Sequence, residues 1–157
     1  MLKKNDWFLK ICESYLNPPV FHNDEQLPAF PTDELQANTT GQAGVETLRE
    51  GDIFYQDCVN NFRDLGSALS KNDKLLDFGV GWGRIARFFL HDLPKENIFG
   101  VDVMEDFVQI CKETFRCDNF FTCDPFPPTS FADEQMNFIV GYSVFSHLSE
   151  NACASWM

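Results

Sequence analysis

A short apolar strand that leads directly into closely spaced glycines constrains the fold of this chain more than any other feature. The strand is predicted over Leu75 to Phe78, and Gly79, Gly81 and Gly83 follow it. Glycine permits a tight turn with positive φ, a close approach of the backbone to a ligand, and close packing of a helix on a strand. A helix is predicted next, over Trp82 to His91. Strand, glycine turn and helix in this order are typical of the first unit of a parallel sheet.

The alternation of short apolar strands with helices continues to the end of the chain, which favours a parallel α/β sheet with crossover helices. The further elements are predicted as strand Ile98–Val101, helix Glu105–Phe115, strand Phe120–Cys123, strand Phe138–Tyr142, and a last helix after the N-cap Ser149. A carboxylate, Asp102, directly follows the strand Ile98–Val101.

The first part of the chain is different, because it shows helices and a long polar segment but no such strands. Apolar side chains recur at helical spacing from Trp7 to Leu16, and a second stripe runs from Phe54 to Leu69, with Asp52 as its expected N-cap. Between them, residues 18–44 are expected to form an arm rather than core. We therefore divide the chain into an N-terminal helical arm and cap, residues 1–73, and an α/β half-domain, residues 74–157.

Composition limits the class of partner. The chain has a formal net charge of −12 with its Lys and Arg residues scattered, so we expect neither nucleic acid nor an anionic membrane as a partner. The opening segment lacks the continuous apolar core of a signal peptide, and no stretch approaches the roughly 20 apolar residues of a membrane span. The six cysteines form no CxxC pair, which predicts no metal site and a reducing, cytoplasmic location.

The glycine-rich turn and Asp102 together predict a nucleoside ligand. The free N–H groups at the start of the predicted helix favour a negative charge or a carbonyl oxygen on the ligand. Asp102 lies about twenty residues beyond the glycines, where an acid accepts hydrogen bonds from both hydroxyls of a ribose. The alternative for this residue is a solvated aspartate in a loop.

The run from Asp77 to Gly83 has an acid two residues before the first glycine and the spacing GxGxG, and it resembles class I S-adenosylmethionine-dependent methyltransferases. Nicotinamide dehydrogenases have GxGxxG instead. The runs Gly100–Asp102, Cys123–Pro125 and Phe131–Leu148 are similar to further motifs of the family, so the resemblance covers about half of the chain. It implies a Rossmann-like sheet flanked by helices, with strand order 3-2-1-4 counted from Leu75. The family's further C-terminal strands are missing, and Asn137 replaces a usual Asp.

The resemblance implies S-adenosylmethionine as cofactor and a role for each matching residue. Asp77 and the three glycines would frame the methionine end, Asp102 the ribose, Val103 and Met104 the adenine face, Asp124 the adenine amino group, and Tyr142 the floor near the sulfonium. The full implied cofactor set is Asp77, Gly79, Val80, Gly81, Gly83, Asp102, Val103, Met104, Asp124 and Tyr142.

Catalysis of methyl transfer rests largely on positioning, and a base is needed only if the acceptor must lose a proton. His147 is the candidate base, because it lies just past the fourth strand and imidazole titrates near neutral pH. The alternative is a histidine that caps the last helix or packs ahead of it.

Three functions remain open from the sequence. The first is methyl transfer from S-adenosylmethionine to a small-molecule acceptor such as a sugar or another metabolite. The second is a truncated or degenerate protein that binds the cofactor without catalysis, and the third, disfavoured by the glycine spacing, is a nucleotide-linked dehydrogenase. With the last strands absent, the strand Phe138–Tyr142 becomes a sheet edge, which we expect to be covered by a second copy in a homodimer or by the N-terminal arm.

Overall fold

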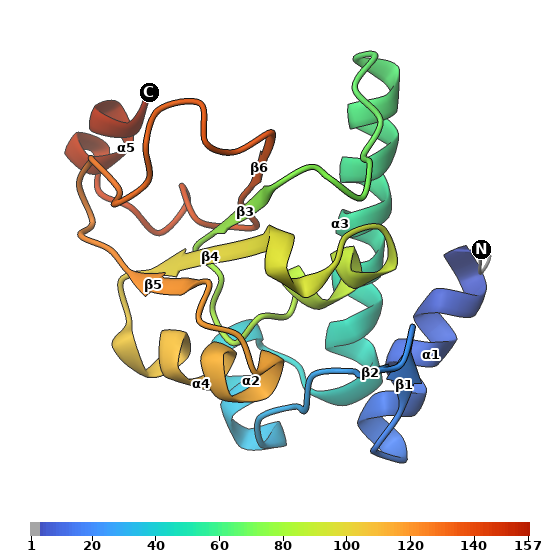
Figure 1. The fold of residues 1–157 in the computed structure, drawn as a ribbon. Coiled ribbons are helices and arrows are strands. Elements are labelled where there is room, and N and C mark those ends of the chain that lie inside the picture. The colour runs from blue at the N-terminus through green and yellow to red at the C-terminus, as the bar shows by residue number, and fades with distance from the viewer. Residues whose placement is uncertain (1–3) are drawn as a thin grey trace.

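The computed structural model describes residues 4–157, which fold around a four-stranded parallel sheet of order β5-β4-β3-β6 (Figure 1). This order confirms the predicted 3-2-1-4. Residues 1–3, part of the segment judged not to be a signal peptide, lie outside the described residues. The strands are β3 (Leu75–Phe78), β4 (Ile98–Asp102), β5 (Phe120–Thr122) and β6 (Phe138–Val140), the last ending two residues earlier than predicted.

The strand β3 lies at the centre of the sheet, with Leu75 opposite Ile98 of β4 and opposite Phe138 of β6. The strand β6 is an edge, because no segment of residues 4–157 pairs with its other side. The N-terminal segment adds no strand to this edge among the described residues, although its Phe62 ring packs on Phe138 of β6 with centroids 4.4 Å apart. Coverage of the edge by the N-terminal arm or by a second copy in a homodimer stays a prediction.

The two faces of the sheet are covered differently. On one face Leu75, Ile98 and Phe120 are almost fully buried beneath α4 (Glu105–Phe115) and the 3₁₀ helix η1 (Ala86–His91). On the other face, Phe78 contacts Trp156 of α5 (Glu150–Trp156), whereas Ile139 is 63% exposed. The predicted α4 is confirmed at both ends, and α5 is capped by the Ser149 hydroxyl as predicted.

The helix predicted over Trp82 to His91 is wrong in type: turns follow Gly81, and only η1 is helical, with 3₁₀ geometry. The carbonyl of Phe88 accepts a hydrogen bond from Trp7 Nε1 at 2.9 Å, and the Asp92 amide bonds the Phe89 carbonyl at 3.0 Å. A partner distant in sequence thus takes a carbonyl that an α-helix would use for residue 92.

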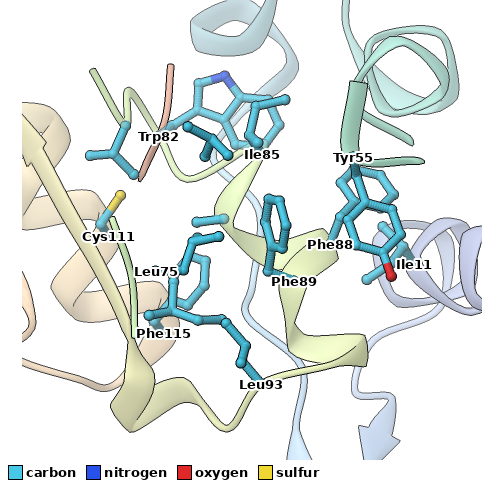
Figure 2. Packing of buried hydrophobic residues seen from close by; sticks show 14 of the residues in the cluster. Ile11, Tyr55, Leu75, Trp82, Ile85, Phe88, Phe89, Leu93, Cys111 and Phe115 are labelled. Atoms are coloured by element: carbon cyan, nitrogen blue, oxygen red, sulfur yellow. The ribbon is translucent and has the colours of Figure 1, made fainter. Parts of the chain in front are cut away.

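The N-terminal residues complete the same hydrophobic core. Helix α1 (Lys4–Leu16) packs against α3 (Gly44–Asp64), and Figure 2 shows Ile11 of α1 and Tyr55 of α3 beside Phe88. The helix α3 begins well before the predicted N-cap Asp52, because the Gln36 side-chain oxygen accepts a hydrogen bond from the Gly44 amide at 3.0 Å.

The predicted arm contains more structure than expected. It holds a two-stranded hairpin, β1 (Phe21–His22) with β2 (Glu25–Gln26), and the helix α2 (Asp33–Thr40). Leu27 of the arm is buried in the core, so the expectation that the arm stays outside the core is wrong there. Among the described residues, no helix is long and apolar enough to cross a membrane. All six cysteines are free, and the cytoplasmic location stays a prediction.

Substitution of Gly83 tests whether this glycine is needed for close packing as well as for its positive φ. Its φ is +80°, and an added Cβ would lie 2.6 Å from Cε2 of the buried Phe115. Gly66 is a matched control, because its φ is +82° and an added Cβ would meet no atom within 4 Å. We expect Gly83→Ala to lower the free energy of unfolding by about 1–3 kcal/mol more than Gly66→Ala, since only the first adds overpacking to the strain. Urea unfolding measures both, and equal losses would contradict the packing role.

Candidate functional site

A cavity of about 660 Å³ lies at the carboxyl ends of the parallel strands, where ligands bind in open α/β sheets. Its walls come from the turn after β3, the segments after β4, β5 and β6, and the helices α2 and α3. The predicted site residues that line it are Gly79, Val80, Gly81, Asp102, Val103, Met104, Asp124, Tyr142 and His147. Asp77 and Gly83 are not part of the lining.

The carboxylate of Asp102 is fixed by two backbone amides. Oδ2 accepts from the Gly81 amide at 2.8 Å, and Oδ1 accepts from the Met104 amide at 2.9 Å. Each carboxylate oxygen has a second lone pair, so the group can still accept hydrogen bonds from a ligand. Asp102 is thus a preorganised acceptor in the cavity wall and not a solvated loop residue, because it is only 9% exposed.

Several amides of the glycine-rich turn are used within the protein. The amides of Gly79 and Val80 both donate to the Val101 carbonyl at 2.9 Å, and the Gly83 amide donates to the Val80 carbonyl. The Gly81 amide donates to Asp102, whereas the amides of Trp82 and Arg84 donate no hydrogen bond among the described residues. The expectation that N–H groups at the start of the predicted helix favour a negative charge or a carbonyl oxygen on the ligand stays a prediction.

Asp77 and Gly83 lie beneath the cavity wall and not in its lining. Asp77 is 1% exposed, and its Oδ2 has no hydrogen-bond partner among residues 4–157, although its carboxylate interacts with the Ala86 amide. Burial, together with the nearby Asp102 carboxylate, raises the pKa of Asp77 from 3.8 to about 7, against the opposing effects of the Ala86 amide and Arg84. Gly83 lets the turn approach α4, since a Cβ there would meet Phe115.

The side of the cavity near β4 and β5 combines apolar surface with acidic groups. Val103 and Met104 are 49% and 52% exposed, although both are apolar. Phe107 also lines this side, as does Asp124, which follows β5. Exposed apolar side chains beside a few polar groups are typical of a pocket that holds a flat, largely apolar ring.

The side of the cavity near β6 holds Tyr142 and His147. The Tyr142 ring packs edge-on against Phe54 of α3, with centroids 4.9 Å apart. Ser149, not His147, caps α5, so a capping role for the histidine is wrong. The His147 imidazole takes part in no hydrogen bond among the described residues, although its backbone amide donates to the Val144 carbonyl at 2.9 Å.

Several lining residues were not predicted from the sequence. Trp82 lines the cavity, and its Nε1 has no hydrogen-bond partner among the described residues. Arg84 directly follows the last glycine, and that position was a usable signal. No local pattern indicates the residues from the N-terminal segment, which are Thr39, Thr40 and Glu50.

Residues 75–157, more than half of the chain, match the family model described as a methyltransferase domain. No curated protein sequence matches the chain. Among solved structures, a Thermoplasma acidophilum protein has 12% identity and a TM-score of 0.54, covering 99% of this chain and 62% of its own. A proposed sarcosine dimethylglycine methyltransferase from Galdieria sulphuraria has 15% identity and a TM-score of 0.52, covering 90% and 49%. These two likenesses establish the fold alone.

A TehB-like S-adenosylmethionine-dependent methyltransferase from Corynebacterium glutamicum is also similar, with 20% identity and a TM-score of 0.45, covering 66% of this chain and 61% of that protein. The chain thus spans less than two thirds of the length of each of these three structures.

The raised pKa of Asp77 gives a pH-dependent prediction. Because its folded pKa of about 7 lies above 3.8, the contribution of Asp77 to stability is fully present below pH 3.8 and is lost as pH rises through 7. Asp77→Asn retains an acceptor for the Ala86 amide but stays neutral at every pH. We therefore expect the stability of the variant relative to the wild type to increase between about pH 4 and pH 8.

Urea unfolding at a series of pH values measures this difference. The exposed Asp106→Asn is the control, and its difference from the wild type should stay nearly constant. A constant difference for Asp77→Asn as well would contradict the raised pKa.

Proposed function

This chain belongs to the class I family of S-adenosylmethionine-dependent methyltransferase domains, and we propose that it binds the cofactor in the cavity and transfers its methyl group to a small-molecule acceptor. The observation that carries the proposal is the Asp102 carboxylate, held in the cavity wall by the amides of Gly81 and Met104. A fixed carboxylate at the end of the second strand suits the two hydroxyls of a ribose.

The residues of the cavity fit this cofactor. The volume of about 660 Å³ is within the range of small-molecule pockets. At Gly81 an added Cβ would meet no atom within 4 Å, so the missing side chain leaves room for the ligand to approach the backbone. The exposed apolar surface of Val103 and Met104 suits the adenine ring, with Asp124 as an acceptor for its amino group.

The charges in the cavity favour a sulfonium nucleoside over a dinucleotide. Glu50, Asp102 and Asp124 line the cavity, whereas the lining cation Arg84 is paired with Glu50 at 3.2 Å. Carboxylates attract a positively charged sulfonium and repel the pyrophosphate of NAD. The amides of Gly79, Val80 and Gly81 are already bonded within the protein and do not offset that repulsion.

The acceptor is proposed to approach from the β6 side. The bound cofactor supplies an electrophilic methyl group, and the protein has to hold the acceptor in line with it. Tyr142 and His147 line this side, and the unbonded imidazole of His147 is free to accept a proton from an acceptor that must lose one. The acidic chain supports a small molecule rather than a nucleic acid as the acceptor.

Calorimetry with S-adenosylhomocysteine and NAD tests the cofactor assignment. We expect Asp102→Ala to weaken S-adenosylhomocysteine binding about tenfold or more while the chain stays folded by circular dichroism. The reason is that hydrogen bonds to a charged acceptor contribute roughly 1.5–3 kcal/mol each. The exposed Asp106→Ala is the matched control and should bind like the wild type.

The proposal would be overturned if NAD binds while neither S-adenosylhomocysteine nor S-adenosylmethionine binds. Turnover is measured separately, as transfer of label from S-adenosylmethionine to mixtures of sugars and other metabolites. Binding without any transfer would instead support the non-catalytic alternative.

A further inference from the structure

Arg84 joins the turn after β3 to the N-terminal segment at one end of the cavity. Its Nη1 donates to Thr47 Oγ1 at 3.1 Å, to the Thr47 carbonyl at 3.3 Å and to Glu50 Oε2 at 3.2 Å. The guanidinium carbon lies 4.7 Å from the centre of the Tyr142 ring. These contacts hold the guanidinium in one position, and its side chain is only 9% exposed.

Glu50 offers the cavity a carboxylate that is only partly used. Its side chain is 40% exposed and lines the cavity. Oε2 accepts from Arg84, whereas Oε1 takes part in no hydrogen bond among the described residues. The pair therefore presents a positive and a negative group side by side, each with hydrogen-bonding capacity left for a ligand.

The order of the strands decides which part of the cofactor meets this pair. Asp124 and Asp102 follow β5 and β4, on one side of the central strand β3, whereas Tyr142 follows β6 on the other side. The cavity thus runs across the sheet from β5 to β6, and the Arg84–Glu50 pair lies at the β6 end, against Tyr142. With the adenine beside Asp124 and the ribose on Asp102, the rest of the cofactor extends toward that pair.

We propose that the Arg84–Glu50 ion pair recognises the amino-acid end of the cofactor, with Glu50 accepting from its α-ammonium and Arg84 donating to its α-carboxylate. This inference rests on the proposed function. It assigns a binding role to α3, which belongs to the N-terminal segment and lies outside the glycine-rich motif. An ion pair is complementary to a zwitterion, because each ligand charge faces its opposite. The Thr47 contacts support it further, since an arginine already held in place loses little freedom on binding.

The test compares S-adenosylhomocysteine with 5′-methylthioadenosine, which shares the adenosine and the thioether but lacks the amino-acid group. We expect calorimetry on the whole chain to give at least roughly tenfold tighter binding of S-adenosylhomocysteine in the wild type. Glu50→Gln should weaken S-adenosylhomocysteine binding by roughly tenfold and leave 5′-methylthioadenosine binding unchanged. Glu46→Gln, on an exposed position one turn earlier in α3, is the matched control and should change neither.

Arg84→Lys provides a second variant, which keeps the charge but loses the fork that binds a carboxylate, and it should also weaken only S-adenosylhomocysteine. The inference is overturned if the wild type binds both ligands equally, if Glu50→Gln weakens both by the same factor, or if it weakens neither. Equal weakening would show that the pair acts only through the fold. Failure of the wild type to bind either nucleoside would instead overturn the proposed function.

Discussion

The cavity depends on the hydrogen bonds by which the end of β4 holds the glycine-rich turn. The Val101 carbonyl accepts the amides of Gly79 and Val80, and the neighbouring Asp102 carboxylate accepts the Gly81 amide. These bonds form only because β3 and β4 are adjacent and parallel, with Phe78 opposite Val101. The shape of the turn is therefore set by the neighbouring strand, and the fixed carboxylate of Asp102 faces the cavity.

Two arginines on the segment after the glycines attach the N-terminal part of the chain to the sheet. Arg84 reaches Thr47 and Glu50, while Arg87 donates to the carbonyls of Pro28 and Ala29 at 3.4 Å. Burial lowers the pKa of Arg87 to about 9, so the group is still protonated at neutral pH. It has backbone carbonyls and the ring of Phe30, 3.9 Å from its guanidinium carbon, as partners. The N-terminal segment thus completes both the core and one wall of the cavity.

The acidic groups of the site lie at two depths, some in the cavity wall and one buried beneath it. Asp102 and Glu50 line the cavity, and each is paired with donors that keep its position fixed. Asp77 lies beneath them, fully buried, where burial and the nearby Asp102 carboxylate raise its pKa. An acid that shares a site with another carboxylate and is removed from water favours its neutral form. The cavity therefore carries its negative charge on the carboxylates that can meet a ligand.

The sequence by itself determined the features that depend on local pattern. Apolar runs and the carboxylate after the second strand were sufficient for the bounds of α4 and the presence of Asp102 in the site, whereas the sheet order came from the resemblance that the glycine spacing supports. The tertiary structure alone decided what depends on partners distant in the chain. Trp7 bonds the Phe88 carbonyl of η1 across 81 residues, and Glu50 bonds Arg84 at the β6 end of the cavity across 34 residues. Such pairs leave no periodic signal, because they form only when packing brings the segments together.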